Sequence, residues 1–400
     1  MNRSEDSMSE EMREIKRAKM QYLGELVNAS LENRVPKAVP KGIEVEEILK
    51  IARDGQMRTL VLFALSKLEI DEEIRKSIQQ ELLWCSMRSL TQIGCLRKIE
   101  ELFEKSGIRF QVLKGAVMKQ IYPKPELREM SDIDVWVYED SFEKADQVLA
   151  SEGFKKKKEI KHHAVYEKLP FIVLEAHWDL IDKSVDKNQH VHFKNECIGV
   201  LKPDKRYEYE FSKEDFYIYM IAHMAKHFYE GGCGIRNLVD IYVYWEKYGL
   251  DMNEAVLKEK LEKCGVADFE NHARQLAYVW LQQKESNEFL NNLFWYMIDS
   301  GIYGKSENGI WSQMVKGAHD ADKKRVKKWY LFPNKAHMCE NYPWVEKYPY
   351  FIFVAWIVRI VSALFNKDVK KREKKLREMD QEEIKTKFEI YKKMNLNYQK

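Results

Sequence analysis

Apolar residues recur at helical spacing through the first hundred residues of the chain. The longest stripe begins at Ile74 and continues with Ile78, Leu82, Leu90, Ile93, Leu96, Ile99 and Phe103. Positions three or four apart lie on one face of a helix, so this stripe predicts a long amphipathic helix. Residues 44–68 also have a helical pattern. The sequence therefore predicts a helical region over residues 1–106.

The pattern changes after Gly107. Residues 109–115 form a short strand-like run, and residues 131–138 alternate acidic with apolar positions before becoming β-branched and apolar. A capped amphipathic helix over residues 140–154 follows, and two more strands are expected over 162–169 and 171–178. Residues 107–185 are therefore expected to form an α/β core.

The helical pattern returns beyond this core. Residues 213–229, 236–249 and 254–265 each have the spacing of a packed helix. We therefore expect residues 186–400 to form a helical C-terminal region. The predicted fold class is α+β, a small sheet with helices between two large helical regions.

One apolar segment, residues 348–366, is near the length of a membrane-spanning helix, which needs about 20 residues. Arg359 lies inside it, and a charge facing lipid costs several kcal/mol. A buried helix is the favoured interpretation, and weak association with a membrane surface is the alternative. No transmembrane anchor is expected.

Composition and charge restrict the classes of partner and compartment. Lys and Arg total 67 and Asp and Glu total 64, which gives a net charge of +3 and no global support for an obligatory nucleic-acid partner. The six cysteines include no C-x-x-C pair, and the first residues lack the apolar core of a signal peptide. Free thiols in a reducing cytoplasm are expected.

The candidate chemistry lies in the α/β core. Asp132 and Asp134 flank one apolar residue, so on a strand both carboxylates point to the same face. Two converging carboxylates repel each other unless a hard cation such as Mg²⁺ lies between them. Gly115 ends the preceding strand and allows close approach of a phosphate to the following helix, and Lys114 supplies a positive charge.

A third acid, Glu175, lies within an apolar strand, with His177 on the same face. A lone buried acid is costly, so Glu175 is expected to have a cation or another partner. Arg128 precedes Asp132 by four residues and is a candidate for neutralising phosphate charge. The alternative interpretation is that Arg128 is an ordinary arginine in a surface loop.

These motifs resemble a minimal family of bacterial nucleotidyltransferase-like proteins within the DNA polymerase β superfamily. The resemblance covers mainly residues 107–182 and rests on Leu-Lys-Gly, Tyr-Pro, Arg, Asp-Ile-Asp and Glu-x-His-Trp. It implies a polymerase β-like core that transfers a nucleotidyl group from an NTP with the help of two Mg²⁺ ions. The ions would be held by Asp132, Asp134 and Glu175.

By the same resemblance, Lys114 and Gly115 would hold the triphosphate, and Arg128 and His177 would assist in binding the nucleotide. One position departs from the family, because Ala116 follows Gly115 where a serine is usual. The acceptor is a hydroxyl of a small molecule, a protein or an RNA. The alternative function is a non-catalytic nucleotide-binding or interaction protein that retains the fold.

The roles of several polar residues stay open at this stage. His223 and His227 have metal-ligand spacing but also continue an apolar helix face. Arg236 and Asp240 are spaced for an ion pair along one helix, and anion binding at the start of that helix, after Gly-Gly-Cys-Gly, is the alternative. His162 and His163 precede the strand pair, and placement on the surface or in the cleft is equally expected for them. Substitution of Asp134 by Asn is expected to abolish transfer and leave the fold intact.

Overall fold

A computed structural model describes residues 10–160, 162–181, 186–197, 199–302, 304–305, 308–317, 342–365 and 378–396, with scattered positions from 322 to 339 and residues 374 and 398. The chain forms two compact units. The first comprises Met1–His223, Arg236–Ser286 and Tyr398–Lys400, and the second comprises Met224–Ile235 and Asn287–Asn397.

The described residues before the sheet are mainly helical, as predicted. The helices are α1 (Glu10–Leu31), α2 (Val45–Asp54), α3 (Arg58–Leu65) and α4 (Glu72–Lys105). The helical pattern of residues 44–68 is interrupted between α2 and α3, where Gln56 has a φ of 52°. Helix α4 begins at Asp71, whose side chain accepts a hydrogen bond from the backbone N–H of Glu73 at 2.8 Å.

The core contains a seven-stranded mixed sheet in the order β3-β4-β5-β2-β1-β7-β6. Its strands are β1 (Phe110–Val112), β2 (Ile133–Val137), β3 (Lys155–Ile160), β4 (His163–Lys168), β5 (Ile172–His177), β6 (Val200–Leu201) and β7 (Glu208–Glu210). Strand β2 is parallel to β5 and antiparallel to β1. The sheet confirms the α+β class, and β6 and β7 extend it beyond residue 185.

Strand β3 was not expected from the pattern. Its sequence is KKKKEI, and all six residues are exposed at the edge of the sheet. Lysines on an edge strand oppose pairing with another chain, so this strand lacks the alternating apolar pattern of a half-buried strand. Pairing with β4 is what makes it a strand.

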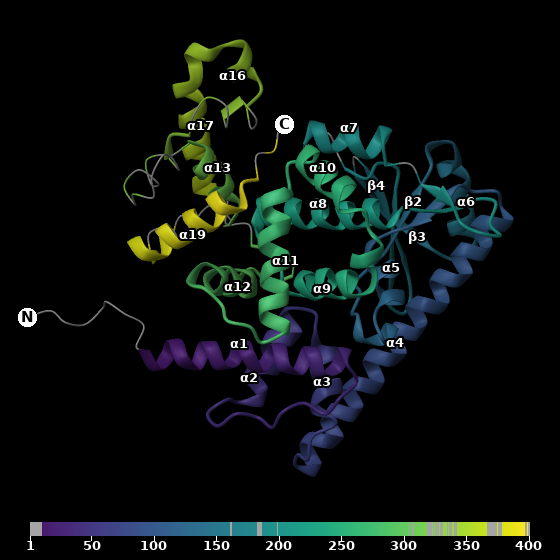
Figure 1. Ribbon diagram of the computed structural model, residues 1–400. Coiled ribbons are helices and arrows are strands. Elements are labelled where there is room, and N and C mark those ends of the chain that lie inside the picture. The colour runs from purple at the N-terminus through teal and green to yellow at the C-terminus, as the bar shows by residue number, and fades with distance from the viewer. Residues whose placement is uncertain are drawn as a thin grey trace, which may run out of the picture. The chain divides into compact units, whose positions relative to one another are not determined.

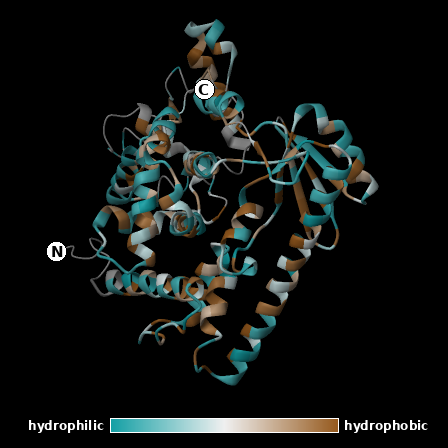
Figure 2. Ribbon diagram, turned by 45° about the vertical axis from the view of Figure 1, so that its right-hand side comes forward, coloured by the Kyte–Doolittle hydropathy of each residue, from teal (hydrophilic) through white to brown (hydrophobic). Residues whose placement is uncertain are grey.

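One face of the sheet is apolar and packs on α4 and on α6 (Phe142–Ser151). Ile133, Val135 and Val137 of β2 are buried in one cluster with Leu96 and Phe103 of α4. Figure 1 shows α4 and α6 beside the sheet, and Figure 2 shows brown, hydrophobic residues along its strands. Because strand side chains alternate, the residues between these apolar positions point to the opposite face. That face carries the polar candidates.

The remaining helices of the first unit are α5 (Lys114–Ile121), α7 (Lys187–Asn195), α8 (Lys213–Gly231, which continues into the second unit), α9 (Arg236–Tyr248), α10 (Glu254–Lys263) and α11 (Ala267–Leu281). Helix α11 packs against α9 and α1. The indole of Trp280 in α11 donates a hydrogen bond to the Met20 carbonyl at 2.9 Å. The N-terminal helices and the helices after the sheet therefore share one folded unit.

The second unit contains α12 (Glu288–Ser300), α13 (Gly309–Gly317), α16 (Trp344–Lys347), α17 (Ile352–Phe365) and α19 (Gln381–Met394). Its buried hydrogen bonds include one between the hydroxyls of Tyr296 and Tyr391, at 2.6 Å. Tyr391 also donates to the Phe228 carbonyl at 3.0 Å. These contacts join α12, α19 and the end of α8.

Helix α17 covers most of the apolar segment at 348–366 and corrects the expectation of a buried helix. Ala355 is buried against Met338 and Val345, whereas Ile357 is 57% exposed and Val361 is 49% exposed. Within the described residues, no helix has the length and apolar character required to cross a membrane. Association of this segment with a membrane surface stays a prediction.

Candidate functional site

Two neighbouring strands place acidic side chains opposite each other. In the parallel pairing of β2 and β5, Asp134 lies directly across from Glu175. Both point away from the apolar face of the sheet. One carboxylate oxygen of each and one ring nitrogen of His177 lie within 4.8 Å of one another. The structure therefore brings together three of the residues that the sequence singled out, at a spacing a single cation could span.

Asp132 lies one residue before β2 and shares the face of Asp134 by the alternation of the strand. It is largely buried, and this burial raises the pKa of Asp132 to about 6, with further increases from the charges of Asp134 and Glu175. Lys114 and Arg236 act in the opposite direction. The charges of three carboxylates and of two basic side chains thus interact electrostatically within this site.

Lys114 supplies the nearest positive charge. Its ammonium donates a hydrogen bond to Asp134 Oδ1 at 2.7 Å, and His177 Nε2 lies 2.8 Å from the same oxygen. Burial opposes ionisation of Asp134, but Lys114 and His177 outweigh it and hold the pKa of Asp134 well below its usual range. The ammonium group of Lys114 therefore supplies a positive charge in direct contact with the Asp134 carboxylate.

The strand before α5 ends earlier than expected, because β1 stops at Val112 and Gly115 is the second residue of α5. Lys114, the first residue of α5, has a left-handed φ of 46°. Gly115 is needed for a close approach, because a Cβ atom there would lie 3.2 Å from Met130 Cγ and 3.4 Å from a guanidinium nitrogen of Arg128. Ala116 is buried in the apolar cluster of the sheet. No side chain caps the N-terminus of α5, whose first residue, Lys114, contacts Asp134.

Arg128 is buried in an ion pair with Asp240 of α9. Its Nε and one terminal nitrogen each lie 2.8 Å from a different oxygen of Asp240, and its other terminal nitrogen donates to the Glu129 carbonyl. Tyr122 donates to the same carboxylate at 2.8 Å. The partner of Asp240 is thus Arg128, and not Arg236 as the helical spacing suggested. A nucleotide-binding role for Arg128 stays a prediction, and its charge already has a partner.

Arg236 is a cationic residue whose role could not be decided from the sequence. It begins α9, contacts the side chain of Gln56, and lies 3.4 Å from the Glu129 carbonyl. Within the described part of the chain it has no carboxylate at ion-pair distance, and its buried Nε has no hydrogen-bond partner. Burial and the charge of Arg128 lower the pKa of Arg236 to about 10. A cation close to Asp132 without a bound anion is suited to bind a ligand's negative charge.

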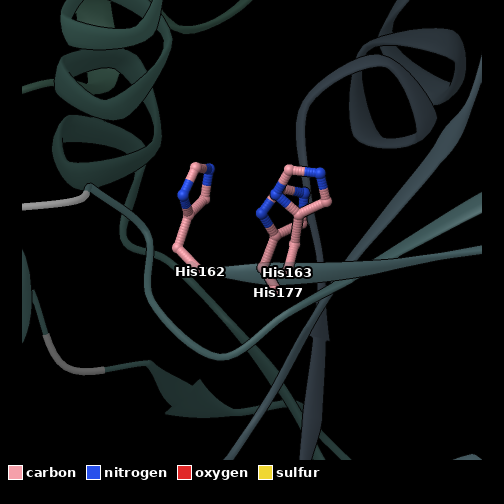
Figure 3. Close-up of side chains that lie close together, drawn as sticks. All are labelled: His162, His163 and His177. Carbon is pink, nitrogen blue, oxygen red and sulfur yellow. The ribbon is translucent and has the colours of Figure 1, made fainter. Parts of the chain in front are cut away.

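Three histidines, His162, His163 and His177, lie close together next to this site (Figure 3). His163 of β4 pairs in register with His177 of β5, and His162 immediately precedes β4. His163 Nε2 lies 3.8 Å from Glu175 Oε2. His162 and His163 therefore belong to the site and not to a remote surface. A consecutive histidine pair at the start of a strand was the only sequence signal for them.

His223 and His227 have less to connect them with the carboxylates. The ring of His223 lies 6.3 Å from that of Tyr219 along α8. Neither histidine belongs to a cluster with metal-ligand spacing within the residues the structure describes. Both histidines are half-buried on α8, and their role stays open.

A match to a family model covers residues 41–282, and the family is described as an uncharacterised nucleotidyltransferase. The matched segment is more than half of the 400-residue chain and includes α2 to α4, the sheet and α8 to α11, but not α1. The chain belongs to this nucleotidyltransferase family. No curated protein and no solved structure matches it significantly.

This nucleotidyltransferase also has a cavity of about 360 Å³ on the carboxylate-bearing side of the sheet. Gln111 of β1, which pairs with Trp136 of β2, forms part of its floor. Aromatic and lysine side chains form much of the wall, and they are Tyr209, Phe211, Phe216, Tyr244, Tyr248, Lys202, Lys213 and Lys247. The ring of Phe211 stacks on Trp136 at 6.3 Å. Two of these lysines are paired with carboxylates, Lys202 with Glu208 and Lys213 with Asp251, and Glu210 also lines the cavity.

Proposed function

We propose that this nucleotidyltransferase moves an NMP group from an NTP to a hydroxyl of an acceptor, with Mg²⁺ held by Asp132, Asp134 and Glu175. The observation that carries the proposal is the register of β2 and β5, which sets Asp134 opposite Glu175 at the end of an Asp-Ile-Asp motif. Oxygen ligands of this kind suit Mg²⁺. When bound, Mg²⁺ ions would activate the acceptor oxygen and stabilise the departing pyrophosphate.

The residues around the carboxylates have roles that follow from their contacts. Lys114 lies at the first turn of α5 and bonds to Asp134, so it can exchange this carboxylate for a phosphate oxygen when a nucleotide arrives. The N–H groups of α5 and the guanidinium of Arg236 would bind the remaining phosphate charge. Despite burial, His177 lowers the pKa of Glu175. Glu175 is therefore ionised at neutral pH and can orient the acceptor hydroxyl.

The cavity is the proposed site of the nucleobase. Val117, Gln120 and Ile121 of α5 line it, three to seven residues beyond Lys114, which is about 5–10 Å along a helix axis. A nucleotide with its phosphates at the start of α5 can therefore extend its base toward the aromatic wall. Substitution of Tyr248 by Ala is expected to raise the KM for NTP with little change in kcat.

The experiment that tests the function is incubation of the protein with each labelled NTP, Mg²⁺ and a cell lysate, followed by identification of labelled products. The Asp132→Asn variant is the matched control and is expected to label nothing. A binding protein without catalysis is the alternative, and the alanine after Gly115 favours it. Stabilisation by NTP that does not require Mg²⁺, together with the absence of any labelled product, would establish that alternative.

The compartment proposed for this chemistry is the cytoplasm. All six cysteines are free, and four of them are buried. Free thiols are characteristic of a reducing compartment. The donor that the proposed reaction would use in this compartment is an NTP.

A further inference from the structure

We propose that His162, His163 and His177 form a binding site for a transition-metal ion such as Zn²⁺, separate from the carboxylate site. One ring nitrogen of each histidine lies within 4.8 Å of the others. Figure 3 shows the three rings on the same side of the strands. Their centroids are separated by 4.6 Å, 4.9 Å and 6.1 Å.

The sheet holds two of these histidines in place. His163 and His177 are register partners on the antiparallel strands β4 and β5, so their side chains leave the same face next to each other. His162 is the residue immediately before β4. Because the strands set the spacing, a metal ion would meet ligands that are already close together. Zinc to nitrogen bonds of about 2.1 Å require only a small rotation of the rings inward.

The carboxylates beside two of the rings suit a metal site, one within hydrogen-bond distance and the other slightly farther away. A histidine that binds a metal commonly donates its second N–H to a carboxylate, which orients the ring. His177 Nε2 lies 2.8 Å from Asp134 Oδ1, and His163 Nε2 lies 3.8 Å from Glu175 Oε2. Within the described residues, the buried Nδ1 atoms of His163 and His177 have no hydrogen-bond partner. In His163 and His177, Nε2 therefore faces a carboxylate and Nδ1 is left for a ligand.

The donor type decides which ion the site takes. Imidazole nitrogen suits Zn²⁺ and its neighbours in the first transition row, whereas Mg²⁺ prefers oxygen and retains its water. The carboxylates and the three histidines thus differ in metal preference while sharing His177. A metal ion bound by the histidines would hold in place the rings that lie beside Asp134 and Glu175, and would thereby fix the orientation of these carboxylates. It would not replace Mg²⁺ at the carboxylates.

A second cluster of potential metal ligands lacks the arrangement described for the three histidines. His192, Cys197 and Asp215 are buried close together. Asp215, however, is already paired with Lys260. Burial, with the charge of Asp215, raises the pKa of the Cys197 thiol far above its usual range. In the metal-free protein this thiol is therefore neutral, and the carboxylate beside it has a cationic partner.

The test is titration of metal-free protein with Co²⁺, which reports nitrogen ligands by its visible absorption. Wild-type protein is expected to bind one Co²⁺ per chain and to release it when Zn²⁺ is added. His162→Gln and His163→Gln are each expected to weaken Co²⁺ binding by at least about tenfold. His272→Gln removes an imidazole of α11 outside the cluster and is expected to bind Co²⁺ as wild type does.

Two further measurements separate this site from the carboxylate site. Excess Mg²⁺ is expected to leave the Co²⁺ spectrum unchanged, a comparison that requires no substitution. Asp132→Asn is expected to retain Co²⁺ binding even though it loses nucleotidyl transfer. Displacement of Co²⁺ by Mg²⁺, or its loss in Asp132→Asn, would place the ion on the carboxylates and overturn the proposal. So would a wild-type protein without a nitrogen-ligand spectrum, whatever its transfer activity.

Discussion

Replacement of Asp132 by asparagine is expected to stabilise the metal-free protein at neutral pH. Burial and the negative charges of Asp134 and Glu175 raise the pKa of Asp132 from 3.8 to about 6. The folded state therefore disfavours the charged form of this carboxyl group more than the unfolded state does. Asparagine has nearly the same volume and no charge. The substitution thus removes repulsion while the packing stays in place.

The size of the effect follows from the pKa. One pKa unit corresponds to about 1.4 kcal/mol, so ionised Asp132 costs the folded state at most about 3 kcal/mol. The buried amide needs hydrogen-bond partners of its own, and the expected net gain in the free energy of unfolding is ~1–2 kcal/mol.

The gain also depends on pH with a defined sign. Because the pKa of Asp132 is raised on folding, the folded state binds more protons than the unfolded state between the two pKa values. The advantage of the variant should be absent below about pH 4, grow between about pH 4 and pH 6, and stay constant above about pH 7.

The assay is urea unfolding of both proteins in EDTA from pH 4 to pH 8. Asp204→Asn is the matched control, because Asp204 is exposed and asparagine tolerates its φ of 60°. With Mg²⁺ and NTP present, the order should reverse, since only wild type gains stability from binding. A variant that is less stable than wild type in EDTA, or a difference that does not change with pH, would refute the electrostatic account of Asp132.

Three other substitutions test the neighbouring charges. Asp134→Asn should lower the free energy of unfolding by roughly 2–4 kcal/mol in urea, because Lys114 loses its counter-charge; this replaces the expectation from sequence that stability is retained, and an unchanged midpoint would contradict it. Arg128→Lys should cost about 2 kcal/mol in the same assay, because one ammonium group cannot make both bonds to Asp240. An unchanged unfolding midpoint with a raised KM for NTP would instead assign Arg128 to the nucleotide. Arg236→Gln should raise the KM for NTP ~10–100-fold in steady-state kinetics without lowering the melting temperature, and an unchanged KM would exclude it from the phosphate site.

Local periodicity was sufficient to predict several elements. The stripe from Ile74 to Phe103 corresponds to α4, which spans Glu72–Lys105. The alternation around Asp132 and Asp134 predicted that both acids share one face, with Asp134 in β2 and Asp132 immediately before it, because strand side chains alternate whatever the rest of the fold does. Patterns of this kind depend on neighbours in sequence and can be read without the structure.

Other features depend on residues far apart in the chain. Strand β3 has no apolar pattern, and its structure comes from pairing with β4 at the edge of the sheet. Arg128 and Asp240 are separated by 112 positions, so no local spacing could show that they form a pair. The exposure of α17 likewise could not be read from its apolar composition, because composition does not say what packs against a helix.

The sequence by itself determined the α+β class, the order of the main helices and strands, and the acids and glycine that resemble a nucleotidyltransferase. Only the tertiary structure decided which charges meet. The register of β2 against β5 sets Asp134 opposite Glu175, and the start of α5 brings Lys114 to Asp134. Alternation along a strand decides the face on which a side chain lies, whereas its partners depend on strand pairing and helix packing between distant segments.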